Sequence, residues 1–183
     1  MPLFRSLAVI GPGLIGSSVL RRGKEMGTLA DTLIAADINP AVLDRVRELG
    51  FADVVTDDMA LAAQADCVMI CVPVGAVEAT ARAILPHMRP GAILTDVASV
   101  RGKLGPTIQA LLPAGVDYVP GHPMAGTEHS GPDAGFATLF ENRWSLLVPP
   151  EGANELAIEK IQKLWELCGA RTKILPDDKH DRI

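Results

Sequence analysis

The stretch LAVIGPGLIGSSVLRRGKEM, residues 7–26, decides the fold class. Its apolar start, Leu7–Ile10, predicts a short buried strand, and Leu14–Met26 predicts the helix that follows. Between the two lie three glycines spaced as G-x-G-x-x-G: Gly11, Gly13 and Gly16. This spacing, directly after a strand and at the start of a helix, is typical of the dinucleotide-binding fingerprint.

The rest of the chain alternates β-rich apolar runs with helical patterns. Cys67–Val72 is apolar throughout, as are parallel strands that are buried on both faces. Further strands are expected at Leu33–Ala36, Ala92–Thr95, Tyr118–Pro120, Trp144–Val148 and Arg171–Leu175. Helices are expected from the Asn39-Pro40 pair to Gly50, and over Val74–Leu85, Leu104–Leu112 and Ala157–Cys168. The alternation predicts an α/β fold, a Rossmann-like, doubly wound and mostly parallel sheet with helices on both faces.

Composition excludes several classes of protein. The 183 residues include 48% hydrophobic residues, which argues against disorder. The net charge of −5 argues against non-specific binding to nucleic acid or to an anionic membrane. The three cysteines are too few for a disulfide framework and are not spaced for a metal. We therefore expect a cytoplasmic protein with no metal site, nucleic-acid partner or membrane span.

The glycine pattern and an acidic residue together predict a nucleotide cofactor. Asp37 ends the second strand 21 residues after Gly16, where the carboxylate that binds the adenosine ribose is expected. Gly11 allows the tight turn, Gly13 lets a pyrophosphate approach, and the amides of Leu14 and Ile15 face the phosphates. A carboxylate repels a 2′-phosphate, so Asp37 favours NAD over NADP. Flavin binding, or a turn that binds nothing, with Asp37 only capping, is the alternative.

A second motif is the polar loop from Gly121 to Gly131, which follows a predicted strand and starts with His122. The segment Asp96–Lys103 follows the preceding strand of the same predicted sheet. Ligands of open α/β sheets bind beyond the carboxyl ends of the strands, and loops there carry function. We therefore expect both loops to reach the same crevice.

Three segments resemble the prephenate and arogenate dehydrogenases of tyrosine biosynthesis. They are GPGLIGS (residues 11–17), TDVASVRGK (95–103) and GHPMAGTEHSG (121–131), the last being the most specific. Cys71-Val72-Pro73 also matches the strand end that lies beside the cofactor in that family, so Val72 and Pro73 are expected to contact it. Order and spacing agree over essentially the whole chain.

The resemblance implies an NAD-dependent oxidative decarboxylation of prephenate to 4-hydroxyphenylpyruvate, or of arogenate to tyrosine. His122 would hydrogen-bond the ring hydroxyl and accept its proton, which suits an imidazole. Ser99 would hold the same hydroxyl or the nicotinamide ribose, and could orient His122, or it could simply cap the following helix. Thr127 and Glu128 would line the substrate side. Arg101 and Lys103 either attract an anionic substrate or are solvated charges at a helix start.

The resemblance also predicts how the chain is organised. Residues 1–176 would be the dinucleotide-binding domain, and 177–183, which contain His180, would start a helical domain that binds substrate and forms a homodimer. This chain would then be the cofactor-binding part of the enzyme, weakly active or inactive alone. The alternatives are a self-standing NAD-binding regulatory module and a related hydroxyacid or imine reductase domain. The sequence does not decide between prephenate and arogenate, or whether tyrosine inhibits.

Overall fold

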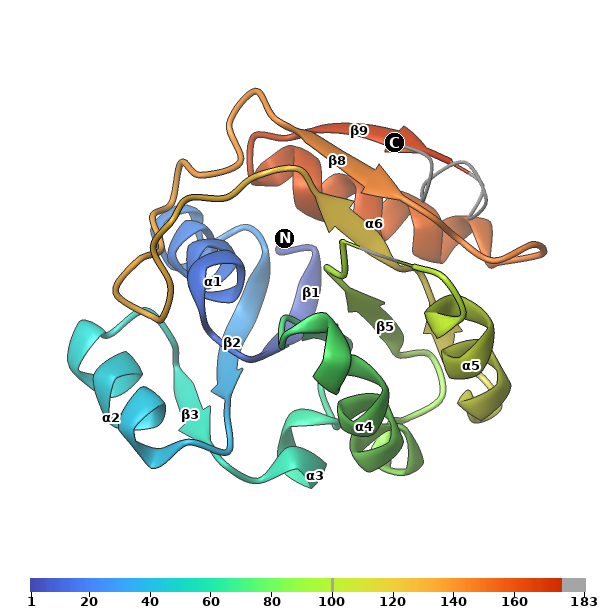
Figure 1. Ribbon diagram of the computed structural model, residues 1–183, viewed down its shortest axis with the longest axis horizontal. Coiled ribbons are helices and arrows are strands. Elements are labelled where there is room, and N and C mark those ends of the chain that lie inside the picture. Colours follow the sequence, from blue (N-terminus) through green and yellow to red (C-terminus); the bar gives the residue numbers. More distant parts are fainter. Residues whose placement is uncertain (100, 176–183) are drawn as a thin grey trace.

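Six parallel strands form the central sheet of this computed structural model, which describes residues 1–99 and 101–175 (Figure 1). The strand order is β3-β2-β1-β4-β5-β6. The bounds are Phe4–Ile10 (β1), Ala30–Ala36 (β2), Val54–Thr56 (β3), Cys67–Ile70 (β4), Ile93–Asp96 (β5) and Asp117–Tyr118 (β6). The strands β1, β2 and β3 follow one another toward one edge of the sheet. The chain then returns to the other side of β1, where β4, β5 and β6 follow one another toward the opposite edge. The predicted doubly wound, Rossmann-like α/β fold is therefore confirmed.

Helices cover both faces of this sheet, and the alternation of β1 shows why. Leu7 and Val9 belong to a core cluster that includes buried residues of α1, α2 and α6. Ala8 and Ile10 belong to a second cluster with α3, α4 and α5. Successive side chains of a strand point to opposite faces, so an all-apolar strand needs a helical layer on each side. The bounds are Leu14–Met26 (α1), Pro40–Leu49 (α2), Met59–Ala62 (α3), Val74–Ile84 (α4), Leu104–Leu111 (α5) and Glu155–Leu167 (α6), with a 3₁₀ turn at Leu85–His87.

The boundaries of α1 and α2 follow from local sequence rules. The helix α1 spans the predicted residues and ends at Gly27, whose φ of 71° is left-handed. At the start of α2 the Asn39 side chain accepts a hydrogen bond from the Ala41 amide, and Pro40 occupies the first turn. Gly50 closes α2 with a φ of 73°, as its predicted position after the last helical residue requires.

A second, three-stranded sheet lies beside the carboxyl end of β5. It consists of β7 (Gly121–Pro123), β8 (Trp144–Leu147) and β9 (Arg171–Ile174). The strand β7 is antiparallel to β8, which is parallel to β9. The helix α6 packs beneath these strands (Figure 1), where Trp165 meets the ring of Phe140 edge-on at 5.1 Å between centroids.

Several predicted elements differ from those observed. The expected strand at Tyr118–Pro120 overlaps β6 only at Tyr118, and β7, which begins at Gly121 in the other sheet, lies in the segment expected to be a polar loop. Pro120 lies between them, and its nitrogen has no hydrogen to donate to a ladder. The strand β3 and the one-turn helix α3 were not predicted. Residues 177–183, the predicted start of a helical domain, lie outside the described residues. Among the described helices, none is long and apolar enough to cross a membrane.

Candidate functional site

The glycine-rich turn joins β1 to α1 in a conformation that requires glycine. Gly11 has a φ of 88°, and its amide donates to the Ala36 carbonyl at 2.9 Å. A Cβ on Gly16 would lie 2.6 Å from the Gly11 carbonyl oxygen, so only glycine lets α1 pack this closely on the strand end. A Cβ on Gly13 would meet nothing within 4 Å. The backbone at Gly13 therefore faces open space, where a ligand can approach it.

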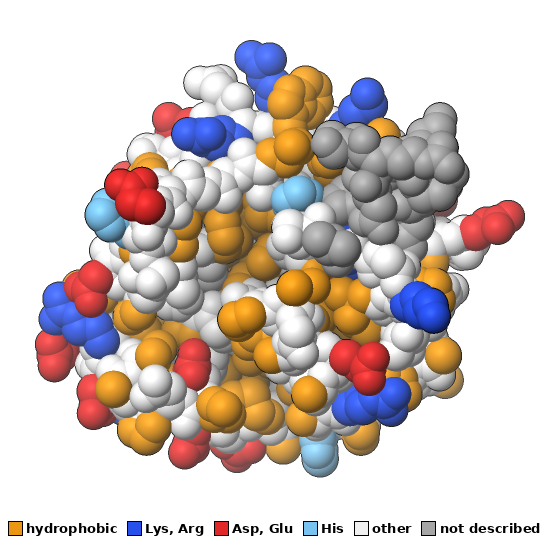
Figure 2. Space-filling model, in the orientation of Figure 1, with side chains coloured by type: hydrophobic (Ala, Val, Ile, Leu, Met, Phe, Trp, Pro, Cys, Tyr) orange, Lys and Arg blue, Asp and Glu red, His pale blue; other side chains and the backbone are white. Residues whose placement is uncertain are grey.

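A largely apolar cavity of about 570 Å³ adjoins this turn. Predicted cofactor residues that line it are Gly11, Gly13, Asp37, Val72 and Pro73. The other lining residues are Ile10, Pro12, Ile38, Val42, Met59, Cys71, Ala76, Ala79, Thr80, Ala83, Gly131 and Pro132. Figure 2 shows hydrophobic side chains on the walls of a hollow near the middle of the face drawn in Figure 1. Local sequence reasoning found the turn and the acidic residue but did not place Gly131, the last residue of the distant polar loop, or the following Pro132 at this cavity.

Leu14, Ile15 and Gly16 do not line this cavity. Leu14 and Ile15 are half-buried in the first turn of α1, where their side chains pack against the core, and Gly16 is buried beneath the turn. Gly13 provides no side-chain cap for α1. The first amides of a helix have no partner within the helix, and they mark its positive end. The predicted role of the Leu14 and Ile15 amides in holding phosphate stays a prediction.

Asp37 stands at the rim of the cavity, just after β2. Its amide donates to the Thr56 carbonyl at 3.2 Å, which ties the residue to β3. One carboxylate oxygen, Oδ1, accepts a hydrogen bond from the Asn39 amide at 2.9 Å. The next side chain, Ile38, lines the cavity although it is 83% exposed. The carboxylate is therefore fixed by the backbone beside an apolar surface on which a flat ring can lie.

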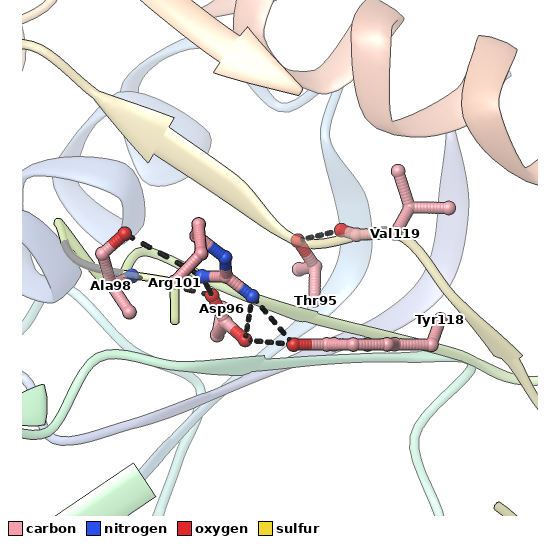
Figure 3. Close-up of polar contacts among 6 residues, drawn as sticks. All are labelled: Thr95, Asp96, Ala98, Arg101, Tyr118 and Val119. Carbon is pink, nitrogen blue, oxygen red and sulfur yellow. Dashed lines mark hydrogen bonds and ion pairs between the residues drawn. The ribbon is translucent and has the colours of Figure 1, made fainter. Parts of the chain in front are cut away.

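A buried ion pair organises the end of β5 (Figure 3). Arg101 and Asp96 have fully buried side chains, and the guanidinium donates to both carboxylate oxygens. Tyr118 accepts a hydrogen bond from Arg101 at 2.7 Å and donates one to Asp96 at 2.6 Å. Burial and the Asp96 charge raise the pKa of Tyr118, so the phenol stays protonated and acts as a donor.

Both interpretations of Arg101 from the sequence are wrong. The side chain is neither a solvated charge nor free to attract a substrate, because it is buried and bonded to Asp96. Burial disfavours the charged guanidinium, but attraction to Asp96 outweighs this and the pKa of Arg101 is raised. The pair flanks the loop that carries Ser99, since Asp96 precedes the loop and Arg101 follows it. The Ala98 amide also donates to Asp96, at 3.2 Å.

The elements that carry Ser99 and His122 meet at the end of β5. Ser99 is exposed on the loop after that strand, and His122 is half-buried in the middle of β7, opposite Leu146. A Cβ on Gly121 would lie 3.5 Å from the Asp96 carbonyl oxygen, so β7 starts directly against β5. The expectation that both loops reach one crevice fits this arrangement, while the catalytic roles of both residues stay predictions.

Thr127 and Glu128 lie further along the polar loop, at the surface. The Thr127 hydroxyl accepts a hydrogen bond from the His129 amide at 3.1 Å. The Glu128 side chain is 86% exposed and lies 3.5 Å from the His129 ring. Their predicted place on the substrate side stays a prediction, and neither residue lines the cavity beside the glycine-rich turn.

Cys67 and Cys168 are buried, and Cys71 is half-buried. Burial raises the pKa of Cys67 and Cys71, and it raises that of Cys168 to about 12. Cys71 lines the cavity, where the negative charge of Asp96 adds to this shift. Within residues 1–99 and 101–175, no group of three or more His, Cys, Asp or Glu side chains is placed to hold a metal ion.

Most of the chain matches a known protein family. A family profile described as "Prephenate dehydrogenase, nucleotide-binding domain" matches residues 21–174. The chain belongs to this family. The match begins after the glycine-rich turn and includes Asp37, the Ser99 loop and the whole polar loop. The predicted family is thereby confirmed, and the chain matches the nucleotide-binding domain of the prephenate and arogenate dehydrogenase family.

Individual relatives extend the match to the glycine-rich turn. The chain is 40% identical over 185 residues to a cyclohexadienyl dehydrogenase of Zymomonas mobilis. The aligned region includes all of this chain and 62% of that protein. The fold of the present chain is similar to that in a crystal structure of prephenate dehydrogenase from Aquifex aeolicus in complex with hydroxyphenyl propionate and NAD+. The TM-score is 0.89, the sequence identity is 27%, and 97% of this chain is covered. A Synechocystis arogenate dehydrogenase structure gives the same three values. The chain spans 62% of each of these three relatives.

Proposed function

We propose that the nucleotide bound by this domain is NAD. The support is the position of Asp37, whose carboxylate is held at the rim of the cavity by the Asn39 amide. There it can accept hydrogen bonds from both hydroxyls of the adenosine ribose, and its charge would repel a 2′-phosphate. The open space beside Gly13 fits a pyrophosphate, and Ile38 offers an apolar surface to the adenine.

We propose further that the domain takes part in the oxidative decarboxylation of prephenate or arogenate. Bound NAD+ would accept a hydride from the ring carbon that bears the hydroxyl. His122, on the strand that starts against β5, would accept the proton of that hydroxyl as the carbonyl develops. Loss of CO2 then makes the ring aromatic, which drives the reaction forward. Because the chemistry is driven in this way, the protein mainly has to position the reacting groups.

Ser99 would act beside His122 in this scheme. Its loop is exposed, so the hydroxyl is accessible to a ligand, and its backbone is held at both ends by the buried pair of Asp96 and Arg101. A hydroxyl both donates and accepts hydrogen bonds, so Ser99 could hold the substrate hydroxyl while His122 removes its proton. Thr127 and Glu128 would contact the far side of the substrate.

Calorimetric titration of the purified chain with NAD+ and NADP+ tests the cofactor. We expect NAD+ to bind at least about tenfold more tightly, which corresponds to one charge repulsion of roughly 1.4 kcal/mol. The variant Asp37→Ser should narrow this ratio. Asp31→Ser is the matched control, because Asp31 is an exposed aspartate near the start of the same strand and does not line the cavity. Equal affinity for both nucleotides in the unmodified chain would refute the NAD assignment.

The activity is tested separately, with NAD+ and either prephenate or arogenate. NADH formation should be accompanied by 4-hydroxyphenylpyruvate from prephenate, or by tyrosine from arogenate. NAD+ binding without turnover of either compound would limit this chain to the nucleotide-binding role, and would leave the cofactor assignment standing.

A further inference from the structure

The segment Gly131–Phe136, here called the strap, joins the polar loop to the nucleotide cavity. It leaves the loop that follows β7, passes α1 and approaches α2 (Figure 1). Its first two residues, Gly131 and Pro132, line the cavity together with the glycine-rich turn and Asp37. More than ninety positions of sequence separate the strap from Asp37, so the two meet only through the fold.

The strap is attached to α1 through its backbone. Arg21 donates from Nη2 to the Pro132 carbonyl at 2.9 Å, and the Phe136 amide donates to the Ser18 hydroxyl at 3.0 Å. A Cβ on Gly135 would lie 3.0 Å from the Ser18 backbone nitrogen, closer than an ordinary contact. The strap backbone therefore rests directly on the helix whose first turn follows Gly13.

A side-chain ion pair attaches the strap to α2. Arg45 donates from Nε and Nη2 to the Asp133 carboxylate, at 2.9 and 2.6 Å. These hydrogen bonds raise the pKa of Arg45 and lower that of Asp133. The two side chains are 44% and 58% exposed, and neither residue lines the cavity. Arg45 belongs to the helix that follows Asp37, so the pair joins the strap to the ribose side of the cavity.

We infer that the strap is a third part of the nucleotide site, beside the glycine-rich turn and Asp37, and that Arg45 and Asp133 are positioning residues for it. This inference rests on the proposed binding of NAD. The strap contacts the adenosine half of the nucleotide through Gly131 and Pro132, and its attachments to α1 and α2 hold it in place before the nucleotide arrives. Without the ion pair, binding must also order the strap, which lowers affinity.

The variant Asp133→Asn tests this inference by titration of the chain with NAD+ and with ADP-ribose. From the strength of exposed ion pairs we expect about two- to fivefold weaker binding of both ligands. ADP-ribose lacks only the nicotinamide, so an equal loss places the effect in the ADP-ribose part of the nucleotide, which includes the adenosine. A simple electrostatic effect has the opposite sign, because removing a negative charge near an anionic ligand would tighten binding.

Asp44→Asn is the matched control. Asp44 lies on α2, the helix that carries Arg45, but it pairs with Arg47 and not with the strap. We expect this variant to bind NAD+ as tightly as the unmodified chain, or slightly more tightly. Arg45→Gln and Asp133→Asn each break the same ion pair. The double variant Arg45→Gln/Asp133→Asn should therefore lose no more affinity for NAD+ than whichever single variant loses more. The three substituted residues, Asp44, Arg45 and Asp133, are exposed, and thermal unfolding would verify that each variant is folded.

Three results would overturn the inference. Asp133→Asn could bind NAD+ as tightly as the unmodified chain, its effect could match that of Asp44→Asn, or ADP-ribose affinity could be unchanged. In each case the NAD assignment itself would stand. If the unmodified chain bound neither NAD+ nor ADP-ribose, both the cofactor proposal and the role of the strap would be wrong.

Discussion

Replacing Arg101 by methionine should destabilise the protein strongly, because it leaves a buried carboxylate without its cation. The Arg101 and Asp96 side chains have no exposed surface, and Arg101 donates to both carboxylate oxygens. After the substitution, Asp96 would keep the Tyr118 hydroxyl and the Ala98 amide as donors. Breaking a buried ion pair on one side lowers the free energy of unfolding by about 3–5 kcal/mol. Total stability is typically about 5–15 kcal/mol, so Arg101→Met should lose a large part of it.

Urea unfolding followed by circular dichroism measures this loss. For a chain of this size, about 3–5 kcal/mol corresponds to a fall in Tm of roughly 6–20 °C. Arg82→Met is the matched control, since Arg82 pairs with Glu78 on the surface and its loss should change stability by no more than about 0.5 kcal/mol.

A second variant separates the unpaired charge from lost packing. Arg101→Met combined with Asp96→Asn leaves no buried charge, so it should be more stable than Arg101→Met alone. The reasoning is refuted if Arg101→Met unfolds within about 1 kcal/mol of the unmodified chain, or if adding Asp96→Asn gives no recovery.

Two further predictions concern the site and the response to acid. His122→Asn should lower turnover at least about 100-fold in an active form of the enzyme, the usual contribution of a general base. Near-normal turnover of that variant would remove His122 from the mechanism. Asp53 has a lowered pKa because its carboxylate accepts a hydrogen bond from the Leu33 amide. Its stabilising effect is therefore present above the unfolded pKa of about 3.9 and is lost as the pH falls through the lower folded value. Asp53→Asn should destabilise the chain at neutral pH and have little effect in strong acid, as thermal melts across pH would show.

Features that depend on neighbours in the sequence were predicted well. The helix α1 has the predicted bounds because the glycines before it and Gly27 after it determine where it starts and stops. The cap at Asn39 and the left-handed Gly50 likewise depend on side chains and backbone within one helical turn. In each case a local hydrogen bond or a positive φ determines where the helix starts or ends. Both can be predicted from the residue type, because asparagine often caps helices and glycine readily adopts a positive φ.

Elements with few local signals were missed. The strand β3 has three half-buried residues and α3 has four residues, so both are too short for an apolar pattern to repeat. The strand β7 was missed because Gly121–Pro123 is a short segment with glycine and proline, which favour a loop, while its hydrogen bonds are made with β8. The partner strand β8, which is distant in sequence, therefore determines that this segment is a strand.

The sequence by itself determined the α/β class, the glycine-rich turn with Asp37, and the family, since each depends on residue types at fixed spacing. Only the tertiary structure decided that Arg101 is a buried partner of Asp96, and that Gly131 and Pro132 reach the cavity beside the glycine-rich turn. The physical reason is desolvation. A charged residue in a polar segment has the same local pattern whether it is hydrated or buried, and the difference comes from the distant elements that pack over it and supply its partners.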